Sequence, residues 1–283
     1  MPELAELRLT ADFINQQAEG KVFYSVKKNP IHKCMDPEPE INFPFTIRAK
    51  SRGKELMLEL TTAPNFATED NIQVKHLMMT MGMSGHFKWI EPGVMSKHSH
   101  LRFQTEDGSL DFVDVRRFGK WNFGYWNSDR GPDPTQDYTN FVKNINTNID
   151  SKAFQKPICE LLMNQKYFNG IGNYLRAEIL YRANVNPWMP AKDAIIEAPE
   201  ILELCKVLPL EAYKLGGGQL KDWENPFGEK NQSWNDFMQC YGNPRMQTRE
   251  WKGRTMWYHP KWDKLTAWCE YSDMPSPMAY ESI

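Results

Sequence analysis

The spacing of hydrophobic residues divides the chain into a strand-rich first half and a helical second half. A helix is predicted over 3–18, because four apolar residues recur there at helical spacing: Leu4, Leu7, Ala11 and Ile14. Residues 21–125 instead alternate between apolar and polar positions, with turn sequences at 51–54 and at Asp107-Gly108. Many short strands after one helix predict a two-layered β-sandwich or a barrel.

A polar stretch separates the predicted strands from a run of predicted helices. The range 129–152 contains Gly131-Pro132-Asp133-Pro134, so we expect an interdomain linker there. Helical spacing returns afterwards and predicts helices over 153–164, 174–184, about 194–214 and about 232–240. The resulting domain boundaries are 1–128, 129–152, 153–239, then 240–265 for a terminal hairpin and 266–283 for a loose tail.

The composition is that of a globular protein and argues against a membrane or disulfide-rich class. Hydrophobic residues make up 41% and charged residues 25% of the 283 positions. We expect no membrane contact, because no apolar run reaches the roughly 18 residues that suggest a transmembrane helix. The first residues also lack the basic start and apolar run of a secretory signal. Five scattered cysteines form no CxxC pair, so we expect reduced thiols in an intracellular protein.

The charge is distributed unevenly, and this changes what the net charge of −2 implies. A neutral chain argues weakly against nucleic acid, but the segment from Cys240 to Lys264 carries six positive residues and two negative ones. Aromatic residues are interleaved with them: Trp251, Trp257, Tyr258 and Trp262. This segment is a candidate phosphate-contacting element, and the alternative is a solvated hairpin with aromatic packing.

The start of the chain is a candidate reactive centre. Methionine before proline is normally removed, which leaves Pro2 as a secondary amine, and an α-amine with a pKa of about 7.7–8.0 is partly neutral at physiological pH. Glu3 adjoins this amine, and Glu6 lies one turn further on the same helix face. An amine flanked by carboxylates suits Schiff-base chemistry. The alternative is an ordinary helix start, where proline and acidic residues are common.

Three further segments carry residues suited to DNA contacts. Met83 lies in the tight loop 82–85, and Arg116 and Phe118 share one side of an extended segment. Such side chains can fill the hole left by a flipped nucleotide, although a strand end with a buried phenylalanine is the alternative. The glycines of 169–173 allow a phosphate to approach closely, and Asn173 then begins a helix whose free N–H groups favour anions.

Together these segments resemble the formamidopyrimidine-DNA glycosylase/endonuclease VIII family, and they occur in its order. The resemblance extends from Pro2 to about Pro260 and is most specific over 161–187, which looks like the family's helix–two-turn–helix. The chain is most similar to the endonuclease VIII-like 1 group, whose zincless finger contains a Gly-Arg-Thr segment matching 253–255. The resemblance implies an α+β fold. An N-terminal helix and a two-layered β-sandwich would precede a helix–two-turn–helix domain that ends in a zincless β-hairpin.

The resemblance also implies an activity and its catalytic residues. A bifunctional DNA glycosylase and AP lyase would excise oxidised bases, with pyrimidines and hydantoins preferred, and then cleave the strand by β,δ-elimination. Pro2 would attack C1′ and form the Schiff base, Glu3 would donate and accept protons, and Glu6 would support the site. Lys54 would contact phosphates beside the lesion and be needed for base excision.

The implied partner is double-stranded DNA that carries an oxidised base or an abasic site. Met83, Arg116 and Phe118 would fill the gap left by the everted nucleotide, while Asn173 and Arg254 would clamp the backbone. We expect a monomer without an organic cofactor, acting in the nucleus or wherever the DNA genome is repaired.

One departure from the family pattern lies at the start of the chain. Family members usually begin Pro-Glu-Gly-Pro-Glu, whereas residues 2–6 here read Pro-Glu-Leu-Ala-Glu. The helix entry is therefore expected to differ slightly without removing activity.

No zinc is expected in the terminal hairpin. Most members of the family close it with two CxxC pairs, whereas this segment has Cys240 and, well past the turn, Cys269. His259 precedes a proline at a strand end, where a surface or packing role is expected. The aromatic residues at 251, 257, 258 and 262 are the candidates for replacing the metal by packing.

Two other functions are compatible with parts of the sequence. A catalytically inactive protein that senses lesions or DNA structure would keep the DNA-contacting residues but could lose Pro2 or Glu3, and the presence of both favours the enzyme. An RNA- or ribosome-associated helix–two-turn–helix protein would not need the N-terminal proline or the gap-filling residues.

Overall fold

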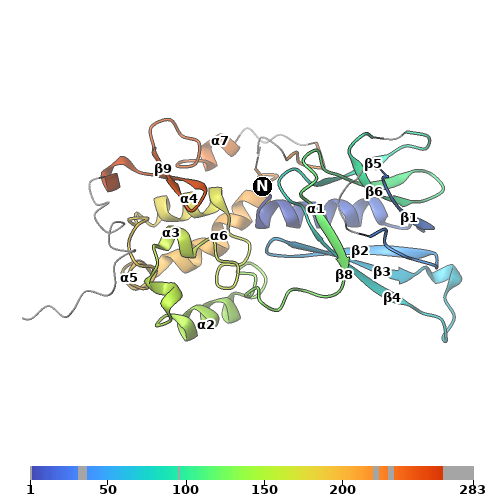
Figure 1. The fold of residues 1–283 in the computed structure, drawn as a ribbon, viewed down its shortest axis with the longest axis horizontal. Helices are drawn as coiled ribbons and strands as arrows, with labels where there is room; N and C mark the ends of the chain where they lie inside the picture. The colour runs from blue at the N-terminus through green and yellow to red at the C-terminus, as the bar shows by residue number, and fades with distance from the viewer. Residues whose placement is uncertain (1, 31–36, 95, 219–222, 229–232, 264–283) are drawn as a thin grey trace, which may run out of the picture.

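The computed structural model describes residues 2–30, 37–94, 96–218, 223–228 and 233–263. A β-sandwich half and a helical half lie side by side along the long axis, and the N-terminal end of α1 (Leu4–Ala18) lies where they meet (Figure 1). The predicted helix over 3–18 is thus confirmed. Glu3 caps it through a reciprocal capping box, in which its own N–H donates to the Glu6 carboxylate at 2.7 Å.

Two four-stranded antiparallel sheets form the sandwich. One has the order β2-β3-β4-β8 and the other β1-β6-β7-β5. The strand bounds are β1 Ser25–Lys28, β2 Phe45–Arg52, β3 Glu55–Thr62, β4 Val74–Thr80, β5 His86–Ile90, β6 Ser99–Gln104, β7 Ser109–Val113 and β8 Lys120–Phe123, with a short 3-10 helix at Pro64–Phe66. The alternation of Phe45, Ile47 and Ala49 places these side chains in the core between the sheets and α1. The two-layered sandwich and both predicted turns are therefore confirmed.

The helical half contains shorter helices than the spacing predicted. Its elements are a 3-10 turn Lys152–Gln155, α3 Ile158–Leu161, α4 Asn173–Arg182, α5 Ala191–Glu197, α6 Glu200–Lys214 and α7 Trp234–Phe237. The single helix expected over 153–164 is wrong, since Pro157 separates the 3-10 turn from α3. The helix expected over 194–214 is likewise divided at Ala198, because a residue before proline disfavours helical backbone angles.

The range 129–152, predicted as a linker, also contains a helix. α2 spans Tyr138–Asn148, and its residues Phe141 and Ile145 are fully buried in the core of the helical half. A mostly polar composition concealed this narrow apolar face, so the linker prediction has to be corrected from Tyr138 onward.

The chain's last two described strands form the hairpin expected from the resemblance. β9 (Gln247–Trp251) pairs with β10 (Arg254–Tyr258), and the two turn residues Lys252 and Gly253 both have positive φ, as a type I′ turn requires. Behind the hairpin, the Trp188 ring lies 5.6 Å from the Trp251 ring and 5.5 Å from the Tyr258 ring. The aromatic residues therefore hold the hairpin against the helical core.

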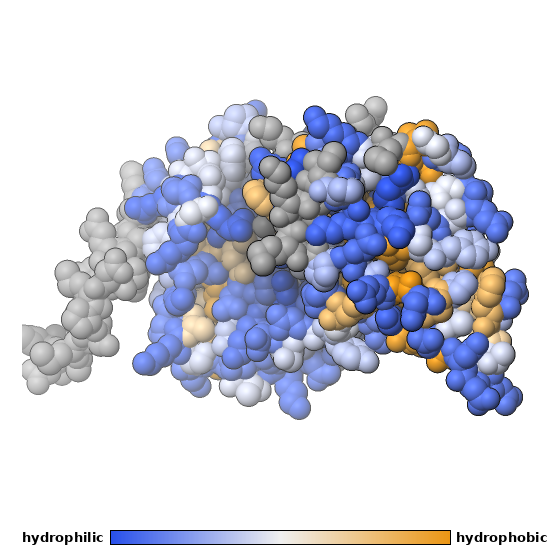
Figure 2. Space-filling model, turned by 45° about the vertical axis from the view of Figure 1, so that its right-hand side comes forward, coloured by the Kyte–Doolittle hydropathy of each residue, from blue (hydrophilic) through white to orange (hydrophobic). Residues whose placement is uncertain are grey.

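The exterior is mostly hydrophilic on the face shown in Figure 2, and the hydrophobic residues visible there gather mainly over the β-sandwich half. Exposed large hydrophobic side chains of that half include Val74 on β4 and Phe123 on β8. Among the described residues, no helix combines the length and the apolar character that crossing a membrane requires.

Candidate active site and DNA-contacting residues

The N-terminal end of α1 meets the N-terminal end of α4 through the Glu3 carboxylate. This carboxylate accepts N–H bonds from Gly172 at 2.7 Å, Tyr174 at 3.0 Å and Leu175 at 3.3 Å. It thereby satisfies donors that the first turn of a helix leaves free. Pro2 is buried directly beside it. The first residues of the chain are therefore held inside the junction between the two halves.

Glu6 connects three segments at the same junction. Its side chain is fully buried and accepts hydrogen bonds from the Glu3 N–H at 2.7 Å, the Tyr174 hydroxyl at 3.0 Å and the Gly218 N–H at 2.7 Å. The glycine run 216–218 thus ends against Glu6, while Gln219 lies outside the described residues. Glu6 fixes the start of α1 relative to α4 and this glycine run.

Lys54 reaches the junction from the turn between β2 and β3. Its Nζ donates to the Ile171 carbonyl at 2.9 Å. A Cβ on Gly172 would collide with both the Glu3 carboxylate and the Lys54 ammonium group. Glycine at 172 therefore allows the two charged groups to approach each other.

The electrostatics of the junction bring two groups close to neutral pH. Burial raises the pKa of Glu3 to about 7, although the Lys54 charge opposes this and the Glu6 charge adds to it. Burial also lowers the pKa of Lys54 to about 8, against the charge of Glu3 and with the charges of Arg254 and Arg130. Groups that titrate near neutrality in a cleft are suited to proton transfer.

Four of the expected site residues line one cavity of about 240 Å³, although they come from distant parts of the chain. They are Glu3, Met83, Asn173 and Arg254. A larger cavity of about 580 Å³ lies between α1, β2 and the segment after β8, and contains none of the expected residues. The smaller cavity is the candidate reaction site, because Glu3, whose pKa is raised, is among its lining residues, whereas Pro2, Glu6 and Lys54 are not.

Asn173 and Arg254 are brought together by the hairpin. Asn173 is the first residue of α4, and its Nδ2 donates to the Thr255 carbonyl at 3.0 Å, while its Oδ1 accepts a bond from Arg176 at 2.6 Å. Arg254 is exposed directly after the turn between β9 and β10. The hairpin contact thus places the start of α4 and an exposed guanidinium side by side.

The loops that carry Met83, Arg116 and Phe118 are fastened to each other by Asp114. Its buried carboxylate accepts bonds from the Ser84 hydroxyl at 2.5 Å, the Gly119 N–H at 2.8 Å and the Arg116 N–H at 3.2 Å. Phe118 is 60% exposed, which rules out the alternative of a buried strand-end phenylalanine. Arg116 and Phe118 lie outside the cavity lining, on the loop beside that of Met83.

Sequence reasoning missed two residues of this arrangement. Asp114 fastens the loops, and Tyr174 binds both glutamates, through its N–H and its hydroxyl. Both adjoin motifs that the sequence did single out, but their partners lie elsewhere in the chain.

The described part of the chain contains no group of three or more His, Cys, Asp or Glu residues that could hold a metal ion. Cys240 is buried, and burial together with the Glu178 charge raises the pKa of its thiol to about 12. The His259 ring stacks near Tyr181 at 6.2 Å, and its Nδ1 accepts the Lys261 N–H at 3.1 Å. Cys269 lies outside the described residues.

Comparison with known sequences identifies relatives along most of the chain. The model of the formamidopyrimidine-DNA glycosylase N-terminal domain matches residues 1–121. Endonuclease 8-like 1 of Homo sapiens is 36% identical over 290 aligned positions, which cover 91% of this chain and 72% of that protein. Formamidopyrimidine-DNA glycosylase of Streptococcus pneumoniae R6 is 28% identical and covers 85% of this chain and 88% of its own length.

Solved structures share the fold. Lactococcus lactis Fpg in complex with DNA that contains an oxidised pyrimidine superposes with a TM-score of 0.75 at 22% identity, over 92% of this chain and 98% of that one. The MutM (Fpg) protein of Thermus thermophilus gives a TM-score of 0.72 at 24% identity with the same coverage. The α+β fold expected from the resemblance is confirmed. The chain belongs to the formamidopyrimidine-DNA glycosylase/endonuclease VIII family, and it is a DNA repair glycosylase with abasic-site lyase activity.

Proposed function

We propose that this enzyme excises oxidised bases from double-stranded DNA through a Schiff base on Pro2 and then cleaves the strand by β,δ-elimination. One observation carries the proposal. Pro2 is buried beside Glu3, whose pKa of about 7 and whose closeness to Lys54 provide groups that can exchange protons at neutral pH.

The first half of the reaction replaces the base by the enzyme. The Pro2 amine forms a bond to C1′ as the glycosidic bond breaks, and the electron pair of that bond leaves with the base, which gains a proton. Opening of the sugar ring then requires a proton on O4′. The Glu3 carboxyl supplies it, because a carboxyl with a pKa near 7 is partly protonated at neutral pH. An iminium between Pro2 and C1′ results.

The second half cleaves the strand. The iminium accepts electrons as C2′ loses a proton, and the 3′ phosphate leaves. A second elimination, in which C4′ loses a proton, releases the 5′ phosphate and leaves a one-nucleotide gap with phosphates on both sides. Water then hydrolyses the iminium and frees the Pro2 amine.

The proposed DNA contacts are those that the family resemblance implies, and the position of Met83, Asn173 and Arg254 around one cavity supports them. Arg254 and Asn173 bind backbone phosphates, and Lys54 binds those beside the lesion. Met83, Arg116 and Phe118 lie on two joined loops and fill the gap left by the everted nucleotide. Eversion costs a few kcal/mol and least at a damaged base, so it contributes to selectivity. A monomer acting on genomic DNA accounts for all of these roles.

The preferred lesions are oxidised pyrimidines and hydantoins rather than 8-oxoguanine. This preference rests on the similarity to Endonuclease 8-like 1 at 36% identity, above the 28% of the Streptococcus pneumoniae glycosylase. Kinetics measured side by side on duplexes with thymine glycol, guanidinohydantoin and 8-oxoguanine test it. A faster rate on 8-oxoguanine would reverse the assignment.

Borohydride trapping on abasic DNA tests the nucleophile. The enzyme is expected to form a covalent complex with the DNA, whereas Pro2-acetylated protein is expected to bind DNA without cross-linking or cleaving it. Full lyase activity with the terminus acetylated would place the nucleophile elsewhere. Binding without any cross-link by the unmodified enzyme would favour the inactive lesion sensor instead.

A further inference from the structure

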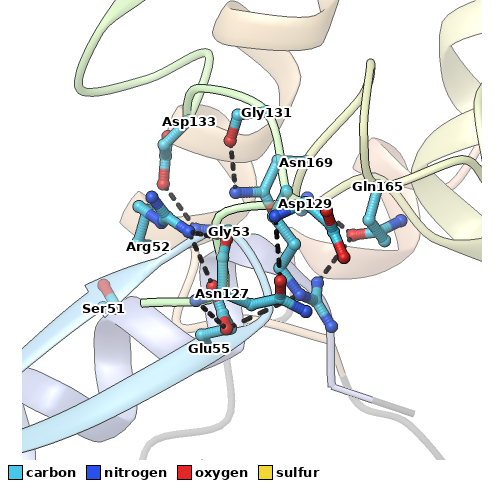
Figure 3. A network of polar contacts seen from close by, with 12 residues as sticks. Ser51, Arg52, Gly53, Glu55, Asn127, Asp129, Gly131, Asp133, Gln165 and Asn169 are labelled. Carbon is cyan, nitrogen blue, oxygen red and sulfur yellow. Dashed lines mark hydrogen bonds and ion pairs between the residues drawn. The ribbon is translucent and has the colours of Figure 1, made fainter. Parts of the chain in front are cut away.

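The turn that carries Lys54 is held from the helical half through its backbone. The Gly53 N–H donates to Asp133 Oδ2 at 2.8 Å, across 80 positions of sequence (Figure 3). Gly53 has a φ of +57°, and a Cβ there would collide with the amide of Asn169. Two side chains from outside the sandwich therefore define where this turn lies.

Asp133 is prepared for this contact by its own segment. Its side chain is 2% exposed, and Oδ1 accepts bonds from the Thr135 N–H at 2.8 Å and the Thr135 hydroxyl at 2.6 Å. Oδ2 accepts a bond from the Gln136 side chain at 3.1 Å besides that from Gly53. A buried carboxylate is costly without such donors, so these bonds fix its orientation.

Asn169 packs its amide against Gly53 of the same turn. It is fully buried in the loop before α4, and its Nδ2 donates to the Gly131 carbonyl at 2.8 Å. Figure 3 shows the two side chains converging on Gly53 from this one network of loops. Arg130 adds a further link, because its guanidinium lies 3.7 Å from Glu55 of β3 and donates to Gln165 at 3.4 Å.

We propose that Asp133 and Asn169 are positioning residues for Lys54. Together they hold the Gly53 peptide so that the Lys54 amine donates to the Ile171 carbonyl and lies near the Glu3 carboxylate. The inference rests on the proposed role of Lys54 in base excision. A shift of about 1 Å in a reacting group can reduce a rate by about 100-fold, so the turn has to be fixed on both sides.

Asp133→Asn is the main test. An amide has one acceptor oxygen, so its NH2 must face either the Gly53 N–H or the Thr135 donors. We expect the single-turnover rate of base excision to fall by about 10- to 100-fold. Abasic-site cleavage should fall several-fold less, and the Kd for DNA should change much less than the excision rate, because only the phosphate contact of Lys54 is displaced whereas those of Arg254 and Asn173 are kept. The double variant Asp133→Asn/Lys54→Leu should be no slower than Lys54→Leu alone.

Asp137→Asn is the matched control. It makes the same chemical change at an exposed carboxylate of the same segment, which accepts bonds from the Asn140 side chain rather than from the turn, so the ratio of excision to abasic cleavage should stay at the wild-type value. If Asp133→Asn does not fold, Asn169→Ala is the second test. It removes the amide that packs against Gly53, so it should also lower the ratio of base excision to abasic-site cleavage.

The outcomes separate this inference from the proposed function. Wild-type protein that forms no borohydride-trapped complex would refute the function itself. Wild-type trapping combined with an unchanged ratio in the folded variant would overturn only the positioning role. Equal losses on both substrates, or losses additive with those of Lys54→Leu, would also overturn it.

Discussion

Two hairpin turns each bring a cation to the junction beside a glycine with left-handed backbone, and they do so in different ways. Between β2 and β3 the turn residues are Gly53 and Lys54, so the cation lies inside the turn. Between β9 and β10 the turn residues are Lys252 and Gly253, and the cation Arg254 begins the return strand. Relative to its turn, the cation therefore lies one position earlier in the first hairpin than in the second.

The surroundings of the two cations differ more than the turns. Lys54 is half-buried beside Glu3, and burial lowers the pKa of its amine to about 8. Arg254 is exposed, and a guanidinium stays charged at any physiological pH. The comparison shows that such a hairpin can present either a partly buried amine with a lowered pKa or an exposed, permanently charged guanidinium, according to the residue type and its burial.

The largest effect is expected from Lys54→Leu. Loss of the buried amine should reduce base excision by about 100-fold or more, as removal of one preorganised charge or donor typically does. Cleavage of a preformed abasic site should fall less, because it requires no positioning of a base. Single-turnover rates on a lesion duplex and an abasic duplex measure the difference. Equal losses on the lesion duplex and the abasic duplex would show that Lys54, like Arg254, acts in DNA binding in general and not in base excision.

Arg254→Ala should have a smaller effect and of a different kind. We expect binding to any duplex to weaken by about tenfold and the salt dependence to lose about 0.9 units of slope, as the loss of one phosphate contact predicts. Lys143→Ala is the charge-matched control, because Lys143 is exposed on α2, on the opposite side of the helical half from β9 (Figure 1). If Arg254→Ala left the affinity for DNA unchanged, or if Lys143→Ala lowered it equally, Arg254 would not make a specific phosphate contact.

Those features of the site that arise from residues close together in the sequence could be predicted, and those that arise from residues far apart could not. The sandwich strands and the turns at Gly53 and Gly253 follow from local alternation and turn chemistry. The sequence itself marks Pro2 as a candidate amine nucleophile, whereas its attack on C1′ and the role of Lys54 came from the resemblance, and only the fold brings the two residues to one junction. No spacing pattern encodes the bond from Gly53 to Asp133, because its two ends are 80 positions apart. The helix α2 was missed for a related reason: its apolar face has meaning only against the core that it covers.

The pH dependence should shift in a defined direction when either cation is removed. The charged groups that act on Lys54 are Glu3, Glu6, Arg130 and Arg254, and the Lys54 charge in turn lowers the pKa of Glu3. Lys54→Leu removes that charge, so the fall in rate that follows deprotonation of the Glu3 carboxyl should move to higher pH. Arg254→Ala removes a charge that lowers the pKa of Lys54, so the fall in rate that follows loss of the Lys54 proton should also move to higher pH. Profiles of single-turnover rates measure both shifts, and a shift to lower pH would contradict the assignments.

The smallest expected effect is that of a metal chelator, which should leave the hairpin of Arg254 unchanged. The described residues offer no cluster of three ligands, and the Trp251 ring instead packs on Trp188 while its Nε1 donates to Glu160 at 3.1 Å. Metal analysis should find no stoichiometric zinc, and EDTA should alter neither the thermal midpoint nor the DNA affinity. Trp251→Ala should instead destabilise the protein by about 1–3 kcal/mol and weaken DNA binding, because the support behind the turn is lost. Bound zinc, or a hairpin that tolerates Trp251→Ala but not EDTA, would show that this turn depends on a metal rather than on packing.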